Sequence, residues 1–396
     1  MPTHTSHQTS PRVAALLAML TLAACGDDAT PNGAAPVYPG TDALGDSPVA
    51  APFTTSTNAP RTIQVSVSSE SLGQQGFDYN ATPAMGDLVF VDGWELRFTR
   101  ILVTVKNVRL NERGASVTDP ASVGAAVATN PRAYAINAHR AGPLTGASGG
   151  GETAIPLFVF TAADSGASLD TATRYALSYD VVAASMAATN VNLDAADLGA
   201  YRSMISRGWT LLIEGDATYR GVAPSAGTVF EGYPTAVHFS FGFGAPARYL
   251  NCRNPDNGGE DTPGVQPSAV GRARAQLTFH MDHAFWEALN REDPPLHFDQ
   301  FASRAQSSGG SFSVALDDLV GVIPTNLRDR MNRPVPDRGT QTMGYTARNP
   351  AALSFDTGGA SGVSDLRDFV AFSARASGHL NADGLCAVRP SGPITF

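Results

Sequence analysis

Apolar and polar residues alternate along several stretches of this chain, and this period of two restricts the fold more than any other feature. In 62–68 and again in 94–98, every second residue is apolar. Successive side chains of a β-strand point to opposite faces of a sheet, so the pattern predicts strands rather than helices. Further strand-like runs lie at 154–162, 175–183, 209–219, 236–243 and 273–280.

The composition agrees with a β-rich fold, because 39 glycines and 27 prolines supply turns and disfavour a helical bundle. Asp92-Gly93, between the apolar run 88–91 and the alternating run from Trp94, predicts a hairpin. Only three short helices are expected, after Asp282, over 299–305 and over 364–374, the last capped by Ser364.

We therefore predict a mainly β, antiparallel β-sandwich-like domain with a few short helices, which follows a disordered tether. The domain is expected to span 62–396 as one unit. A boundary near 190–203 is the alternative, although no linker composition is visible there.

The amino terminus has the order of a secretory signal. Polar residues that end in Arg12 precede an apolar run over 13–24, and Cys25 follows. The run has 12 residues, whereas a helix that crosses a bilayer needs about 20. We therefore expect a signal peptide rather than a transmembrane helix.

The motif Leu22-Ala23-Ala24-Cys25 resembles the lipobox of bacterial lipoprotein precursors. This resemblance implies that 1–24 is removed and that Cys25 carries the lipid, including palmitate, that anchors the protein. In that family an Asp directly after the cysteine favours retention in the inner membrane, and Gly26 stands at that place here. The resemblance thus implies the outer membrane, with a soluble secreted protein as the alternative.

Residues 25–61 are rich in Pro, Gly and Ala and have no apolar period, which predicts a flexible tether. Folding of this segment onto the domain is the alternative. Further along the chain, Phe90–Leu110 and Gln276–Trp286 resemble segments of uncharacterised secreted bacterial lipoproteins. That second resemblance implies a location and no activity.

The formal net charge of −9, from 27 basic and 36 acidic residues, offers no basic face for nucleic acid. The expected partners are the membrane, through the lipid, and an envelope protein or a small ligand. Cys252 and Cys386 remain after lipidation of Cys25, and in an oxidising compartment they are expected to form a disulfide. A pair of metal thiolates and a redox dithiol are the alternatives, and no Cys-x-x-Cys supports the latter.

The candidate chemistry is a cluster of metal-ligand side chains around His280. Imidazole and carboxylate groups suit zinc or copper. No His-Glu-x-x-His is present, so the sequence lacks the metalloprotease motif, and ordinary hydrogen-bonding roles for the histidines are the alternative. The predicted metal ligands are His280, His283, His238, His297, Asp282 and Glu287.

These observations favour a ligand-binding, metal-binding or structural module of the cell envelope over an enzyme, and they identify no catalytic residue. The rival hypotheses are a metal-dependent hydrolase, with Asp282 or Glu287 as the base, and an assembly factor without a small ligand.

Overall fold

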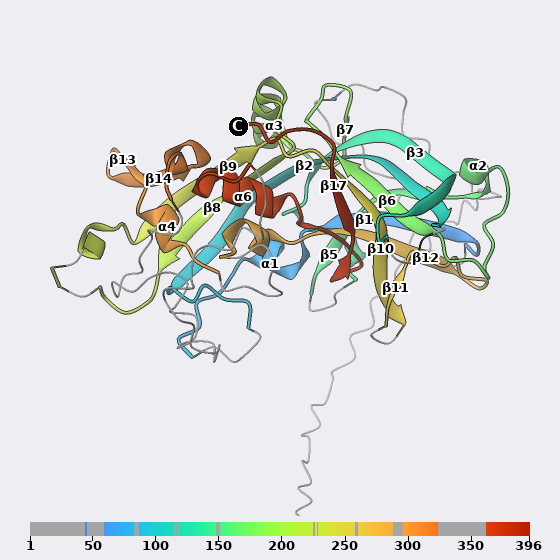
Figure 1. The fold of residues 1–396 in the computed structure, drawn as a ribbon, viewed down its shortest axis with the longest axis horizontal. Helices are drawn as coiled ribbons and strands as arrows, with labels where there is room; N and C mark the ends of the chain where they lie inside the picture. Colours follow the sequence, from blue (N-terminus) through green and yellow to red (C-terminus); the bar gives the residue numbers. More distant parts are fainter. Residues whose placement is uncertain are drawn as a thin grey trace, which may run out of the picture. The chain divides into compact units, whose positions relative to one another are not determined.

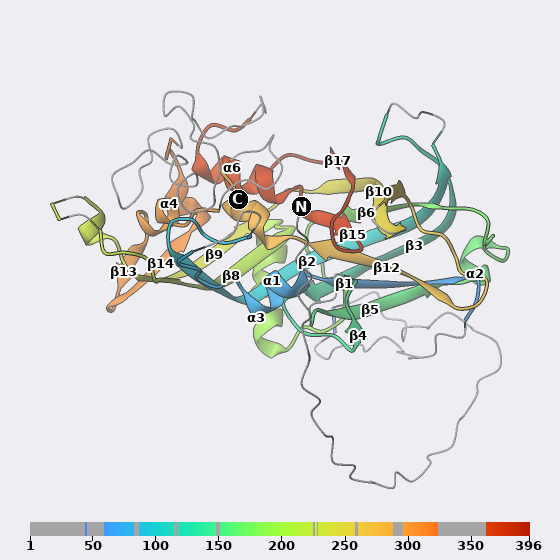
Figure 2. The ribbon, with the colours of Figure 1, turned by 90° about the horizontal axis from the view of Figure 1, so that it is seen from below.

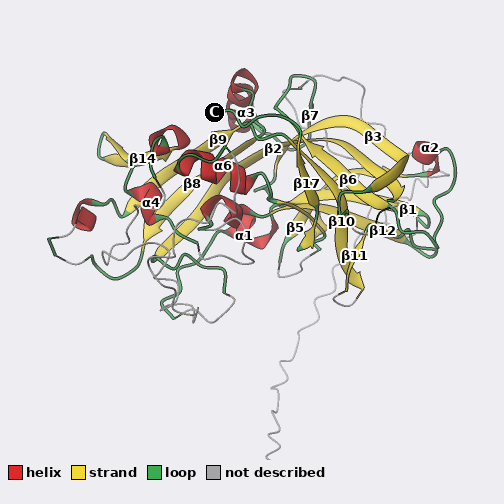
Figure 3. Cartoon of the chain, viewed as in Figure 1, coloured by secondary structure: helices red, strands yellow, loops and turns green. Residues whose placement is uncertain are grey.

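A computed structural model gives the fold of this chain. It describes residues 44–45, 59–82, 87–114, 116, 119–147, 151–224, 226–227, 229–257, 260–287, 296–323 and 362–396, all of which belong to one compact unit. Strands dominate (Figure 3), and they form two sheets (Figure 1). The predicted mainly β, sandwich-like fold is confirmed.

The smaller sheet has six strands, and β1 lies inside it. β1 runs parallel to β12 and antiparallel to β5. Its order is β16 (Gly384–Leu385), β15 (Gly378–Leu380), β12 (Arg272–Phe279), β1 (Thr62–Ser68), β5 (Thr153–Phe160) and β4 (Leu144–Thr145).

The larger sheet has eleven strands, and the 20-residue β2 is its spine. β2 pairs with β8 along its first half, and with β6 and β3 along its second half. The main order is β11 (Glu260–Pro263), β10 (Ala247–Asn257), β6 (Ala176–Val181), β2 (Trp94–Arg113), β8 (Leu211–Tyr219), β9 (Ala236–Phe243), β14 (Ser311–Ala315) and β13 (Gln306–Ser308). β17 (Ala387–Pro390) pairs with β10, and β3 (Val123–Asn137) pairs with β2 and with β7 (Thr189–Asn190).

Most pairings are antiparallel, but β1–β12, β9–β14 and β3–β7 are parallel. Antiparallel pairs predominate, and the three parallel pairs make the sheets mixed. Long crossover connections allow these pairs, because a parallel partner cannot be reached through a tight hairpin.

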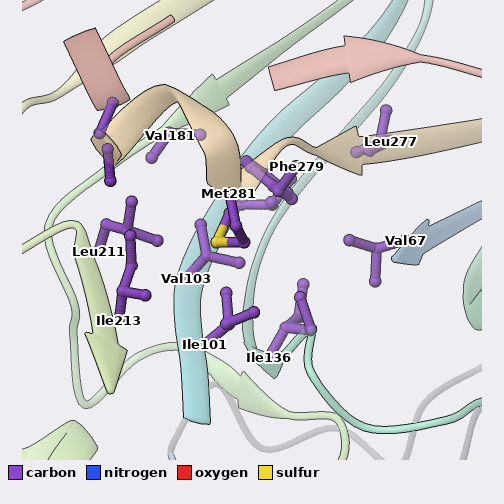
Figure 4. Close-up of a cluster of buried hydrophobic side chains, with 14 of the residues drawn as sticks. Val67, Ile101, Val103, Ile136, Val181, Leu211, Ile213, Leu277, Phe279 and Met281 are labelled. Carbon is purple, nitrogen blue, oxygen red and sulfur yellow. The ribbon is translucent and has the colours of Figure 1, made fainter. Parts of the chain in front are cut away.

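The main core lies between the two sheets, which Figure 2 shows with β1, β5 and β12 in one layer beside β2, β3 and β6. Ile101 and Val103 of β2 point into it, together with Val67 and Leu277 of the smaller sheet (Figure 4). The alternating Leu102 faces a second buried cluster, on the side of α3 (Ala195–Arg207). This alternation is why β2 is buried on both faces.

α3 occupies the region of the alternative domain boundary. The Asp194 carboxylate caps its first turn, and Gly208 ends it in a left-handed conformation with φ 70°. The hydroxyls of Thr104 on β2 and Tyr201 on α3 are 2.7 Å apart. This buried contact fastens the helix to the large sheet.

The three predicted helices are present but short, as η2 (Met281–Phe285, a 3₁₀ helix), α4 (Asp299–Ala302) and α6 (Leu366–Ala374). Asp365 rather than the predicted Ser364 caps α6, since its carboxylate accepts a hydrogen bond from the Asp368 amide at 3.0 Å. The other helices are α1 (Glu70–Gln75), α2 (Ala162–Ser165), η1 (Val229–Gly232) and η3 (Leu316–Leu319). None of the helices in the described part of the chain is long and apolar enough to span a membrane.

The hairpin expected around Asp92-Gly93 is not formed. The chain does turn at Gly93, but the Val91 amide donates to the carbonyl of Leu296 at 3.1 Å. The Asp92 carboxylate also accepts the amides of Phe298 and Asp299, at 2.6 and 2.7 Å. These hydrogen bonds connect the run 88–91 and Asp92 to residues 296–299 instead of to β2.

Residues 253–264 also depart from what their composition favours, since Asn, Pro, Asp and Gly are typical of a loop. The first part of this stretch is the end of β10, and β11 follows, so the stretch forms a hairpin. The run Asn-Pro-Asp-Asn resembles a turn by composition, and pairing with the neighbouring strand overrides that local preference.

Residues 1–43, including Cys25, lie outside the described residues. Within the predicted tether, Leu44 is buried, and its amide donates to the carbonyl of Met186 at 2.6 Å. The carbonyl of Gly45 accepts a hydrogen bond from Asn190 at 3.1 Å. The tether is therefore not free of the domain at this point, because Leu44 packs into the cluster beneath α3.

The predicted disulfide between Cys252 and Cys386 is present. It joins β10 to the residue between β16 and β17. The hairpin of β15 and β16 is thereby attached covalently to the larger sheet.

Candidate metal centre

Three histidines meet at the end of the smaller sheet. His280 directly follows β12, and His283 lies on η2. A 3₁₀ helix completes a turn in three residues, so the side chains of His280 and His283 lie on the same side of it. The antiparallel pairing of β12 with β15 sets Thr278 opposite His379. One ring nitrogen of each histidine lies within 4.8 Å of the other two. We call His280, His283 and His379 the imidazole triad.

Two carboxylates lie beside the same site. β1 and β12 run in parallel with Ser68 opposite Thr278, so Glu70 lies next to His280 just beyond the strand ends. Asp383 comes from the loop between β15 and β16. Ligand atoms of Glu70, His280 and Asp383 lie within 4.8 Å of one another. We call these three residues the carboxylate triad, and it shares His280 with the imidazole triad.

The site contains several buried polar atoms without hydrogen-bond partners. Among the described residues, no hydrogen bond reaches Nε2 of His280, Nδ1 of His283, Nδ1 of His379 or Oε1 of Glu70. Glu70 Oε1 and His280 Nε2 are 3.1 Å apart, but their orientation is not that of a hydrogen bond. Glu70 and His280 thus form an ion pair, whereas one nitrogen each of His283 and His379 is buried without a hydrogen bond among the described residues, which is uncommon for buried polar atoms.

The rings of His280 and His379 are stacked, with 3.9 Å between centroids and 1° between planes. Lone pairs of stacked imidazoles run side by side and do not converge on one point. In a tetrahedral zinc site with bonds of about 2.05 Å, ligand nitrogens are about 3.4 Å apart. Binding therefore requires a rotation of one ring and a closer approach of the ligands.

The electrostatics differ between the histidines. Burial, together with the nearby His280, lowers the pKa of both His283 and His379 well below the usual value. Burial works in the same direction on His280, but the Glu70 carboxylate outweighs it and raises the pKa of His280 to about 9. The two deeper imidazoles are therefore neutral at pH 7, the state in which histidine binds a metal.

The backbone is left-handed at Glu70 and at the two residues before Asp383. Glu70 has φ 58°, and its amide donates to the Ser68 hydroxyl at 3.1 Å. Asn381 and Ala382, just before Asp383, have φ 49° and 66°. Non-glycine residues in this left-handed region cost about 1–3 kcal/mol each and cluster at functional sites.

Hydrogen bonds to the neighbouring strands hold these conformations. The side chain of Asn381 accepts from the Gln276 amide at 2.8 Å and donates to Asn254 at 2.9 Å. The Thr278 hydroxyl donates to the Ala382 carbonyl at 3.0 Å. The loop that presents Asp383 is thus fixed to β12 and β10.

The other predicted ligands lie outside both triads. Oδ2 of Asp282 accepts from the indole of Trp286 at 2.8 Å, and burial raises the pKa of Asp282. His297 and Glu287 pair with each other, with Nε2 and Oε2 2.8 Å apart. His238 is exposed on β9, and its Nδ1 is 3.0 Å from Oδ1 of Asp216. Of the six predicted ligands, only His280 and His283 belong to the two triads.

The sequence analysis missed Glu70, His379 and Asp383. Each is an isolated residue without a ligand motif around it. Only the pairings of β12 with β1 and with β15 bring them to His280. The short interval between His280 and His283 was the one local signal.

No protein-family model, curated protein or solved structure matches this chain.

Proposed function

We propose that this protein is a lipid-anchored protein of the bacterial cell envelope that binds a divalent transition metal, zinc or copper, at the imidazole triad. The observation that carries the proposal is the convergence of three imidazoles, two of them buried, each of which has one buried nitrogen without a hydrogen bond among the described residues. Ordinary hydrogen-bonding histidines would have satisfied those nitrogens.

The donor set favours zinc or copper. Three imidazoles with a nearby carboxylate suit these ions, whereas calcium and magnesium prefer oxygen ligands. Cys252 and Cys386 offer no thiolate because they are bonded to each other. Glu70 is the nearest carboxylate to complete a four-ligand set, at 3.1 Å from His280.

Metal binding is favoured over a metal-dependent hydrolase. The hydrolase hypothesis assigns the base to Asp282 or Glu287, and both residues are engaged elsewhere. Asp282 accepts a hydrogen bond from Trp286, and Glu287 pairs with His297. This arrangement supports a binding module, as the sequence favoured.

The metal proposal is tested on the full-length protein purified from membranes in detergent. We expect metal analysis and titration of the metal-free protein with Zn²⁺ and Cu²⁺ to give one ion per chain. The double variant His280→Ala/His283→Ala should lose this binding. His238→Ala is the matched control and should retain it, since His238 is exposed on another sheet. A folded wild-type protein that binds neither ion would refute the proposal.

The anchor is tested separately, because it depends on Cys25 and not on the metal centre. Cells labelled with radioactive palmitate should yield labelled protein in the outer-membrane fraction. The Cys25→Ser variant should be unlabelled and should leave that fraction. Equal membrane association of both proteins would contradict lipid anchoring.

A further inference from the structure

The two triads share His280 and differ in exposure, which suggests an order in which an ion meets them. His283 and His379 are buried, His280 and Glu70 keep side-chain exposures of 13% and 14%, and Asp383 is exposed. Ligand atoms therefore form a continuous series from the surface to the interior. The first members of that series are carboxylates, and the last are imidazoles.

The inner end of the series is closed by packing. The ring of His283 lies 3.7 Å from that of Trp286, and its carbonyl accepts a hydrogen bond from Ser373 of α6 at 2.6 Å. The carbonyl of His379 lies 3.4 Å from the Tyr179 hydroxyl. An ion bound among the imidazoles is thus shielded on this side, and the carboxylate triad lies on the side of solvent.

We propose that a divalent transition-metal ion is captured by the carboxylate triad and then passes to the imidazole triad, with His280 as the ligand common to both. This inference rests on the proposed function and deepens it. Asp383 and Glu70 attract the hydrated cation, His280 releases to solvent the proton that it shares with Glu70, and Glu70 and the neutral imidazole then replace part of the ion's water. Rotation of His280 away from the stack with His379 then brings the ion to the inner nitrogens.

The backbone supports a role for Asp383 in capture. Its loop holds two non-glycine residues at positive φ, fixed by the hydrogen bonds of Asn381 and Thr278. Positive φ at successive residues is what a tight hairpin turn requires, and this turn between β15 and β16 places Asp383 next to Glu70 and His280. Asp383 is therefore held in place above His280 at the exposed end of the site.

Capture by an exposed carboxylate is a kinetic role, so the test separates rates from affinity. The full-length metal-free protein is mixed with Cu²⁺ in a stopped-flow instrument, and the fluorescence of Trp286 beside His283 reports arrival at the imidazole triad. Dissociation is measured by a chase with excess chelator. We expect Asp383→Asn to lower the association rate constant by about tenfold, in the range of electrostatic steering. Its dissociation rate constant should not rise.

The matched control is Asp317→Asn, which removes an exposed carboxylate on η3 whose nearest arginine nitrogen is 4.0 Å away. This control should leave both rate constants unchanged. Faster dissociation from Asp383→Asn would show that Asp383 is a resident ligand and would overturn the capture role. Unchanged association would overturn it as well. Absence of Cu²⁺ binding by the wild-type protein at equilibrium would instead refute the proposed function itself.

Discussion

The rings of His280 and His379 lie face to face, 3.9 Å apart, because β12 and β15 pair in antiparallel register next to them. The backbone ladder thus fixes the distance between two side chains that are far apart in the sequence. It also brings both rings next to His283, and Nδ1 of His379 has no hydrogen bond among the described residues. A metal ion would replace the missing partners.

His379 should matter for metal binding as much as the two predicted histidines. We expect His379→Ala to weaken Zn²⁺ binding by more than about 100-fold, because even residues outside the ligand shell contribute about 10–100-fold. Competition with a chromophoric chelator measures the change. His238→Ala serves as the control, and equal affinities for His379→Ala and the wild type would exclude His379 as a ligand.

The stability of the metal-free protein should depend on pH in two opposite ways. The pKa values of His283 and His379 are lowered by burial, so the unfolded chain takes up protons that the folded chain does not. Their contribution to stability is therefore complete above about pH 6.5 and is lost as the pH falls. The pKa of His280 is raised to about 9. Its contribution is complete below about pH 6.5 and is lost as the pH rises toward 9.

Urea denaturation at a series of pH values tests this dependence. Relative to wild type, His280→Gln should flatten the decline in unfolding free energy between about pH 6.5 and 9, a change of about 3 kcal/mol. His379→Gln should instead flatten the decline below about pH 6.5. Parallel curves for wild type and both variants would contradict the assigned protonation states.

The disulfide should support both the fold and the metal centre. Cys252 and Cys386 are 134 residues apart in sequence, and closing such a loop stabilises by about 4–5 kcal/mol on the chain-entropy model. Cys386 closely follows Asp383, so the bond also restrains the hairpin that carries two ligands. We expect Cys252→Ser/Cys386→Ser to lower the denaturation midpoint and to weaken Zn²⁺ binding. Cys25→Ser is the control, and an unchanged midpoint for the double variant would contradict this role.

Much of the fold could be predicted because its strands carry a local signal. The alternating runs became β1 and β2, and the run at 236–243 became β9 with the same limits. β3 gave no such signal, since its residues are mostly Ala, Gly and Asn, which have low strand propensity. The pairing of β3 with β2 decides its conformation.

The site was predictable only where its ligands are close in sequence. His280 and His283 share a turn, and that interval was visible. His379 and Glu70 reach the site through strand pairing, which sequence periodicity does not specify. Glu287 was a predicted ligand as well, but the 3₁₀ turn ends at Phe285 and Glu287 pairs with His297 instead.

Ser68 should act on the metal centre through Glu70. Its hydroxyl accepts the amide of Glu70 at 3.1 Å and donates to Glu152, so it links the left-handed conformation of Glu70 to a buried carboxylate. We expect Ser68→Ala to lower the unfolding free energy by about 1–3 kcal/mol, because buried partners lose a hydrogen bond. It should also weaken Zn²⁺ binding by about 10–100-fold, as residues that orient ligands do.

Tyr201→Phe is the matched control for this effect. It also removes one buried hydroxyl, but that hydroxyl bonds to Thr104 beneath α3 and not to the smaller sheet. We expect Tyr201→Phe to lower the unfolding free energy by a similar amount, about 1–3 kcal/mol, and to leave the Zn²⁺ affinity unchanged. If both variants weaken binding in proportion to their loss of stability, Ser68 acts only on the fold. A loss of affinity confined to Ser68→Ala would identify it as a positioning residue for Glu70.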